Sequence, residues 1–253
     1  MVNSIKKYTI SLIYSPFTDK HLNEVFAISK AIESFGNKVL IFKANRDIIS
    51  ELKKESIDLA FNLARKSEIE GYNTSIPAIC ELLDIFVIGP NVFSASVYNS
   101  EDIFLQILKY DEIPFITNLS LQDTPNLIQI FLLGTINPWY FLKTPSYISI
   151  DSTLEPKIIE ISKRAFSSIH GSDYCKFTFF LENENSFLIE INQMPLLGSD
   201  SDFAKLAKLK GINYINFINI IVYNALKRYN LQIPEEYEPL IDLIEKNLYS
   251  PKV

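Results

Sequence analysis

The stretch Phe187-Leu-Ile-Glu190-Ile-Asn192-Gln-Met-Pro195 decides how this chain is organised, because it carries polar side chains on one face of an apolar strand. Successive side chains of a strand point to opposite faces, so Glu190 and Asn192 share a face. Ile189 and Ile191 are expected to point the other way, into a core. Two polar groups in this position indicate a site rather than packing.

A second alternating run, Lys176-Phe-Thr178-Phe-Phe-Leu181, precedes this strand and is joined to it by four polar residues. The pair predicts a β-hairpin whose three-residue loop is Asn183 to Asn185, with Asn185 in the left-handed conformation. That loop places Thr178 opposite Glu190 and Lys176 opposite Asn192. The polar face of the hairpin is then made of these four side chains.

A carboxylate and a carboxamide two residues apart on a strand can serve a magnesium-nucleotide site. Mg²⁺ takes a few protein oxygens and completes its shell with phosphates and water. The spacing alone favours a simpler interpretation, in which Glu190 and Asn192 are solvated residues on the open face of a hairpin.

Composition excludes several classes of protein. The 253 residues carry a net charge of -6, without the basic excess typical of nucleic-acid binders. Cys80 and Cys175 have no metal-type spacing, so we expect buried thiols in a reduced, cytoplasmic protein. The first residues lack the apolar core of a signal peptide, and the apolar run 127–142 is interrupted by polar residues and too short to span a bilayer. We therefore expect neither nucleic acid nor membrane as a partner.

Strand-like and helix-like segments alternate along the chain, which predicts an α/β fold. A Rossmann-like domain is expected over residues 1–114 and a second domain over 115–253. The expected strands lie at 8–14, 38–43, 58–62, 85–88, 139–142 and 147–150, and the expected helices at 23–35, 46–55, 75–83, 99–110 and 156–169. The last two of these strands are expected to pair with each other. An acidic amphipathic helix over 234–248 is predicted to be a docking element.

The residues from about 165 to 229 resemble the C-terminal end of the ATP-grasp ligases related to D-alanine:D-alanine ligase. In that family a strand pair carries R-x-D and then E-x-N-x-x-P-G-L, and here Glu190, Asn192 and Pro195 stand at the matching positions. A second block agrees in order: Asp58-Leu-Ala-Phe61-Asn62 matches the family's D-x-x-F-N, and Pro77-Ala-Ile-Cys-Glu81 matches its P-A-L-L-E. The resemblance implies a Rossmann-like N-terminal domain followed by an ATP-grasp domain that is shortened here.

The resemblance also implies roles for individual residues. It makes Glu190 and Asn192 the ligands of Mg²⁺, and Lys143, Glu190 and Asn192 the residues that bind ATP. Lys176, at the position of the family's Arg, would be the catalytic residue that stabilises the transferred charge, although it lacks the planar guanidinium fork. ATP-grasp ligases phosphorylate a carboxylate and let an amine attack the acyl phosphate, so the implied substrate is a small molecule or a peptide. We consider one oligomer for this chain, a homodimer formed through the N-terminal domain.

The chain departs from the family where ATP and metal are held. Thr178 replaces the Asp on the other side of the metal pair, and Asn99-Ser100 replaces D-K, so one phosphate-facing lysine is missing. The seven glycines are widely spaced, whereas loops that wrap around phosphates need glycine. The segment from Phe115 to Ile169 is shorter than the family's central region, which predicts the loss of the lid that closes on ATP and leaves only short strands and one helix there.

Three functions remain open at this point. The first is a catalytically impaired ATP-grasp relative with at most weak binding of nucleotide, anion or Mg²⁺ around Lys143, Lys176, Glu190 and Asn192. The second is an active minimal ATP-dependent carboxylate-amine ligase that obtains missing parts from a partner. The third is a purely structural or interaction module. For the first, we expect Lys176 to form an ion pair with Glu190 in place of the metal.

Overall fold

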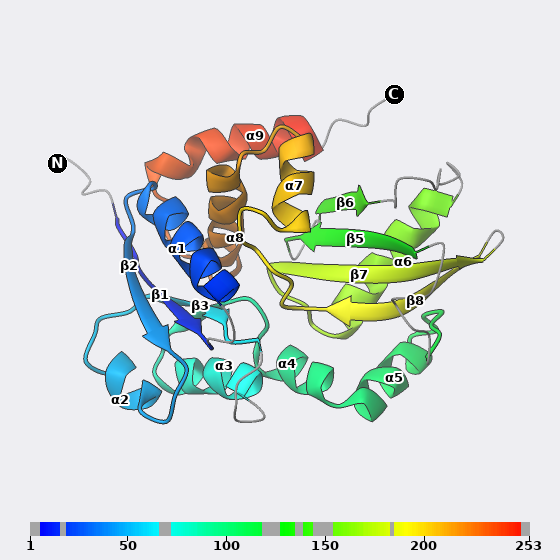
Figure 1. The fold of residues 1–253 in the computed structure, drawn as a ribbon, viewed down its shortest axis with the longest axis horizontal. Helices are drawn as coiled ribbons and strands as arrows, with labels where there is room; N and C mark the ends of the chain where they lie inside the picture. Colours follow the sequence, from blue (N-terminus) through cyan, green and yellow to red (C-terminus); the bar gives the residue numbers. More distant parts are fainter. Residues whose placement is uncertain are drawn as a thin grey trace. The chain divides into compact units, whose positions relative to one another are not determined.

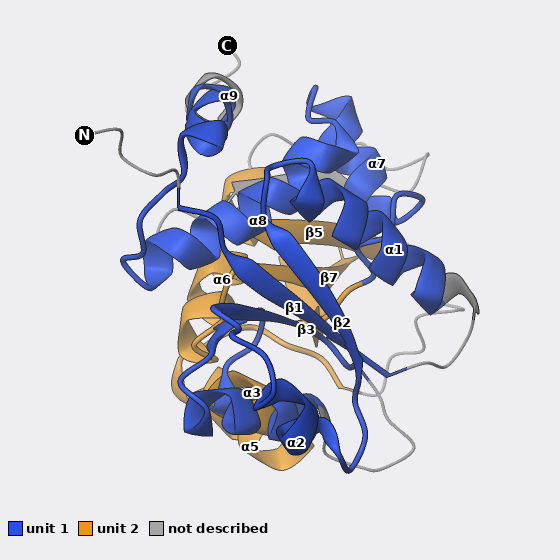
Figure 2. Ribbon diagram, turned by 90° about the vertical axis from the view of Figure 1, so that its left-hand side faces the viewer, with its two compact units in different colours: residues 1–92, 196–253 blue, residues 93–195 orange. Residues whose placement is uncertain are grey.

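Two four-stranded sheets organise the protein, seen here in a computed structural model (Figure 1). The structure describes residues 6–15, 19–65, 72–117, 127–134, 139–143, 154–182 and 185–248. One sheet is parallel and the other antiparallel, so the predicted mixed α/β class is confirmed. Each sheet belongs to its own compact unit, shown in separate colours in Figure 2.

The first unit comprises residues 1–92 and 196–253 and holds the parallel sheet, in the order β2-β1-β3-β4. Its strands are β1 (Thr9–Tyr14), β2 (Lys38–Lys43), β3 (Leu59–Leu63) and β4 (Phe86–Ile88). Its helices are α1 (Asp19–Glu33), α2 (Ile48–Leu52), α3 (Tyr72–Leu82), α7 (Asp202–Leu209), α8 (Tyr214–Arg228), the short 3-10 helix η1 (Glu235–Tyr237) and α9 (Glu238–Leu248).

Helices cover both faces of this parallel sheet, α1 and α8 on one side and α2 and α3 on the other (Figure 2). The central strand β3, Leu-Ala-Phe-Asn-Leu, is buried along its whole length, as a strand covered on both faces must be. The alternation of strands and helices predicted over residues 8–88 is confirmed. Helix α1 begins four residues earlier than expected.

The C-terminal segment is fixed to this unit by buried polar groups. The Tyr237 hydroxyl accepts a hydrogen bond from Asn37 Nδ2 (2.9 Å) and donates one to Asn219 Oδ1 (3.3 Å). Asn37 Oδ1 in turn accepts from the backbone N–H of Tyr8, whose hydroxyl donates to the carbonyl of Gln232. These hydrogen bonds join Gln232 and Tyr237, at the start of the C-terminal segment, to the rest of the first unit.

Replacing Tyr237 with phenylalanine should lower the free energy of unfolding by about 1–3 kcal/mol, because it leaves the Asn37 donor and the Asn219 acceptor buried without their partner. Urea denaturation measures the loss. Tyr110→Phe is the matched control, since Tyr110 is 87% exposed, and it should change stability little. Equal stability of the two variants would contradict the role of the network.

The second unit comprises residues 93–195 and holds the antiparallel sheet, in the order β6-β5-β7-β8. Its strands are β5 (Leu127–Leu133), β6 (Trp139–Lys143), β7 (Tyr174–Glu182) and β8 (Asn185–Asn192). Its helices are α4 (Val92–Asn99, all but the first residue), α5 (Glu101–Tyr110) and α6 (Leu154–Ser168).

One face of this sheet is apolar and packs on α5 and α6. Alternate residues of β5 and β7 share a core with α6, and fully buried members include Ile130, Phe177 and Ile158. The opposite face of the same strands therefore carries the polar side chains, as the alternation predicts.

Two elements of this unit were not expected from the sequence. The helix expected over 99–110 is α5, which begins two residues later, whereas the preceding helix α4 was not predicted. The strand β5 was not predicted either, and it pairs with the expected strand that begins at Trp139. The partner expected for that strand, 147–150, lies outside the described residues.

The two compact units also fall differently from the predicted ranges 1–114 and 115–253. Helix α5 packs into the core of the second unit, so residues 93–114 join it. Residues 196–253 join the first unit, because α8 packs on α1. Within 115–169, the described elements β5, β6 and α6 belong to the sheet and core of the hairpin. In the described part of the chain, no helix combines the length and apolar character needed to cross a bilayer.

Candidate functional site

The hairpin β7–β8 has the predicted register at its polar end. Thr178 lies opposite Glu190 and Lys176 lies opposite Asn192, which confirms the pairing expected from the sequence. The route to that register is different, however. Glu182 pairs with Asn185, so the loop has two residues and the expected three-residue loop is wrong.

A β-bulge lies between the loop and the site. It shifts the pairing of the two strands by one residue, and this shift gives the predicted register at the polar end. Phe179 pairs with Leu188 and Thr178 pairs with Glu190, so Ile189 is the extra residue of β8. A bulge breaks the alternation of side chains and redirects the strand. Ile191 is in the core as expected, whereas Ile189 is not among the buried core residues and lines a surface pocket instead, so its predicted orientation was wrong.

A row of polar positions crosses the whole antiparallel sheet. Lys143 of β6 pairs with Gln129 of β5, Gln129 pairs with Thr178, and Thr178 pairs with Glu190. Residues directly opposite in an antiparallel ladder point to the same face. The backbone thus brings Lys143 to the same face as Glu190, at the far end of the row. The described side chains do not include that of Lys143.

Lys176 and Glu190 form the ion pair that was predicted to replace the metal. Lys176 Nζ lies 3.2 Å from Glu190 Oε2, with the two side chains only 18% and 29% exposed. The buried hydroxyl of Thr178 donates a hydrogen bond of 2.8 Å to the same oxygen. One carboxylate oxygen is therefore neutralised by an ammonium and a hydroxyl, so partial burial of Glu190 carries little electrostatic cost.

Asn192 is engaged by its own chain. Its Oδ1 accepts a hydrogen bond of 2.9 Å from the backbone N–H of Met194, as asparagine commonly does at a turn. Its backbone carbonyl accepts from the thiol of Cys175. These contacts fix the end of β8 where the chain turns toward Pro195.

Glu190 and Asn192 do not fit Mg²⁺ in this structure. Mg²⁺ requires near-octahedral coordination by oxygen, usually with one or two carboxylates. Here an ammonium stands beside the single carboxylate, and the Asn192 oxygen is already bound to a backbone donor. Within the described ranges there is no group of three or more His, Cys, Asp or Glu side chains that could hold a metal ion.

Two weak acids near the ion pair, Tyr98 and Cys175, are held in their neutral form. Burial raises the pKa of the Tyr98 phenol, and the negative charge of Glu190 raises it further. Burial, followed by the same Glu190 charge, holds the pKa of the Cys175 thiol well above its usual range. Cys80 is also buried, and burial raises its pKa to about 12. The structure confirms that both thiols are buried, and their lack of reactivity stays a prediction.

Native protein at pH 8 should react with a thiol-specific disulfide reagent on the order of 100-fold more slowly than protein unfolded in guanidinium, because reaction requires an exposed thiolate. Absorbance of the released chromophore gives both rates. Cys80→Ser and Cys175→Ser assign the residual reaction to one thiol. Rapid modification of either cysteine in folded protein would contradict the burial.

Two further polar features were missed by the sequence analysis. Gln129 Oε1 is buried and has no hydrogen-bond partner among the described residues. The sequence offers one signal for this group, since Gln129 is the single polar residue inside the apolar strand Leu127–Leu133. In the first unit, the buried carboxylate of Glu24 forms two hydrogen bonds with Arg65, at 2.7 and 2.8 Å, and a third with the backbone N–H of Leu197.

The position expected to carry D-K in the family is structural here. Asn99 ends α4, and Ser100 is the N-cap residue of α5 without a side-chain cap hydrogen bond. Neither position supplies a cation to the polar row.

Comparison with known proteins supports the resemblance on both sequence and structure. Residues 143–223 match the family model described as D-ala D-ala ligase C-terminus. D-alanine–D-alanine ligase from Bacillus anthracis superposes with a TM-score of 0.71 at 13% identity, covering 89% of this chain and 99% of that one. The same ligase complexed with ATP gives 0.73 at 14%, with coverage of 89% and 100%. The ligase from Coxiella burnetii gives 0.70 at 16%, with coverage of 95% and 100%. No curated protein sequence matches the chain significantly.

Proposed function

We propose that this chain, an ATP-grasp protein related to the D-alanine–D-alanine ligases, keeps the ligase fold but not ATP-driven ligation. The observation that carries the proposal is the ion pair between Lys176 and Glu190. In a magnesium-dependent ligase, that carboxylate must be available to the metal that neutralises the phosphates. Here an ammonium of the chain itself occupies its oxygen.

The neighbouring positions support the same proposal. Thr178 offers a hydroxyl where a second carboxylate would be needed, and this hydroxyl donates to Glu190 rather than binding a cation. Ser100 provides no charge at the phosphate-facing position. Lys143 is left as the candidate contact for an anion at the other end of the polar row. Any nucleotide or anion is therefore bound weakly.

A titration of the protein with Mg-ATP tests the proposal directly. We expect no saturable heat up to about 1 mM ATP, which corresponds to a binding free energy weaker than about 4 kcal/mol. An active D-alanine–D-alanine ligase, titrated in the same buffer, is the control. Low-micromolar affinity, about 7–8 kcal/mol, would contradict the proposal.

The alternative is an active minimal carboxylate-amine ligase that works with a partner. It is favoured by one observation: the superposition spans 100% of a ligase chain that was solved with ATP. ATP-dependent release of phosphate in the presence of amino acids distinguishes the two. Release by the purified chain, abolished in Glu190→Gln, would establish the alternative. Its absence, with no heat of Mg-ATP binding, would favour the first proposal.

A further inference from the structure

A small cavity in the second unit lies beside the polar row but is built from other residues. It is open to the surface and lined by α5, by the segment Phe115–Thr117 and by β8, and its volume is about 140 Å³. Cavities of this volume hold a molecule about the size of benzene. They are too small for a nucleotide.

The cavity is made by the bulge in β8. Leu188 pairs in parallel with Phe115: its N–H donates to the carbonyl of Pro114 (2.9 Å), and its carbonyl accepts from the N–H of Ile116 (3.0 Å). With Ile189 as the extra residue, both Ile189 and Glu190 line the cavity, which regular alternation would not allow. Bulges are frequent next to functional sites, where they redirect a side chain.

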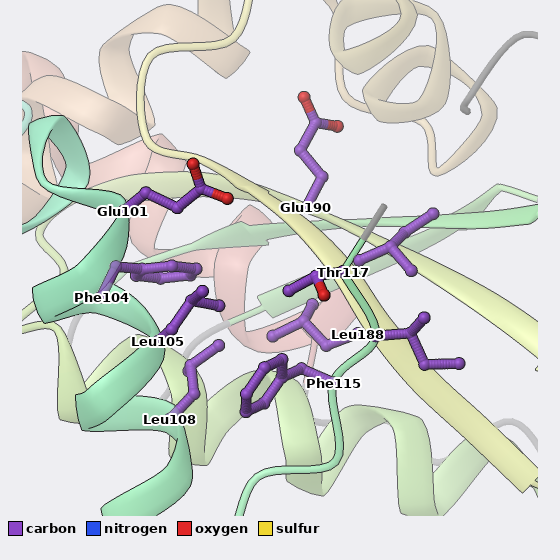
Figure 3. A pocket seen from close by; sticks show the side chains of 10 residues that line it. Glu101, Phe104, Leu105, Leu108, Phe115, Thr117, Leu188 and Glu190 are labelled. Atoms are coloured by element: carbon purple, nitrogen blue, oxygen red, sulfur yellow. The ribbon is translucent and has the colours of Figure 1, made fainter. Parts of the chain in front are cut away.

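The walls of the cavity are apolar and rest on the core. Phe104, Leu105 and Leu108 of α5 face Phe115 and Leu188 across the space (Figure 3). Leu108 and Leu188 are each only 1% exposed and belong to the core cluster of this unit. The floor is therefore fixed before any ligand arrives, and a preformed apolar pocket binds without an ordering cost.

The charged groups at the cavity are acidic. The carboxylates of Glu101 and Glu190 lie on the same side, above the apolar side chains in Figure 3. Lys176 neutralises Glu190, whereas the side chain of Glu101 makes no hydrogen bond or ion pair within the described part of the chain. None of the ten lining residues is Lys, Arg or His. One negative charge is left over, beside a space with apolar walls.

We propose that this cavity binds a small organic ammonium ion whose apolar body is about as large as a benzene ring. The apolar body fills the space between α5 and β8, and the ammonium lies between Glu101 and the free side of Glu190. The charge of the site disfavours carboxylates and phosphates of the same size. This site is distinct from any nucleotide site and does not depend on the proposed loss of ligation.

Benzylamine is the probe, with benzyl alcohol as its neutral counterpart and benzoate as its anionic one. Titrations are carried out without nucleotide or metal and followed by backbone amide chemical shifts of Thr117, Leu188 and Glu190. We expect saturable shifts with benzylamine, about fivefold weaker binding of benzyl alcohol and no binding of benzoate. Failure of Mg-ATP binding leaves this result unaffected, so the two proposals are tested separately.

Two variants assign the binding to the cavity. Glu101→Gln should weaken benzylamine about fivefold and leave benzyl alcohol unchanged. Asp102→Asn, at the adjacent exposed position of α5 that does not line the cavity, is the matched control and should change neither. Leu105→Trp should fill the cavity and remove both probes, with a thermal melt to establish that the variant is folded. Unsaturable benzylamine shifts, equal binding of benzoate, or no effect of Glu101→Gln would each overturn the proposal.

Discussion

Replacing Glu24 with alanine is expected to destabilise the first unit by about 3–5 kcal/mol, the largest effect of a single substitution considered for this chain. The Glu24 side chain is 3% exposed, and its carboxylate accepts two hydrogen bonds from Arg65 and one from Leu197 N–H. Without it, the guanidinium of Arg65, itself only 16% exposed, loses its two hydrogen bonds to this carboxylate and the charge that it faces. Breaking a buried pair from one side is costly because the remaining ion has lost its water and its partner.

Urea and thermal denaturation measure this loss, which corresponds to a fall in the midpoint of roughly 6–20 °C. Glu33→Ala is the matched control, because Glu33 lies on the same helix and is exposed. It should change stability by less than about 0.5 kcal/mol. Glu24→Gln, which keeps an acceptor but not the charge, should fall between the two. A loss below about 1 kcal/mol for Glu24→Ala would show that solvent reaches the pair more freely than its burial implies.

The hairpin shows how far periodicity alone can go. Alternation fixed which side chains share a face, so Lys176, Thr178 and Glu190 were placed together correctly. A three-residue loop over 183–185 was expected from the sequence, and the polar pairing was derived from it. In the structure a two-residue loop and the bulge at Ile189 give the same pairing. The bulge depends on Leu188 pairing with Phe115, a contact between residues far apart in sequence that no local pattern contains.

Groups that interact across long sequence separations were missed for the same reason. Glu24 and Arg65 are 41 residues apart and lie on different elements, so neither stands out as a partner of the other in the sequence. Gln129 was visible only as a polar interruption of an apolar run, and its place in the row required the pairing of β5 with β7. In contrast, the positions of the strands and helices that form the parallel sheet were predicted well, because each of them has its own local pattern.

Under the proposed function, the ion pair between Lys176 and Glu190 stands where the resemblance implies a metal ion, and substitutions can test this. Thr178→Asp alone should not produce ATP-driven ligation. The new carboxylate would lie next to Glu190, and the ammonium 3.2 Å from Glu190 Oε2 would be shared between the two rather than leave for a metal. Ligation also requires phosphate contacts that this substitution does not supply. Phosphate release above that of the parent would contradict this expectation.

Combining Thr178→Asp with Lys176→Gln should create divalent-cation binding that the parent lacks. The double variant removes the competing positive charge and presents two carboxylates next to Asn192, a donor set that suits Mn²⁺ and Mg²⁺. We expect Mn²⁺ to bind at least about tenfold more tightly than to the parent, measured by its electron paramagnetic resonance signal. Thr178→Asn with Lys176→Gln is the matched control, because it has the same shape without the second carboxylate.

If the double variant is marginally folded because its two carboxylates repel each other, Mn²⁺ should raise its melting temperature, since a ligand that binds only the folded state stabilises it. A double variant that binds Mn²⁺ no better than the control, by both signal and melting temperature, would mean that the geometry of this face, and not the charge of Lys176, excludes the metal.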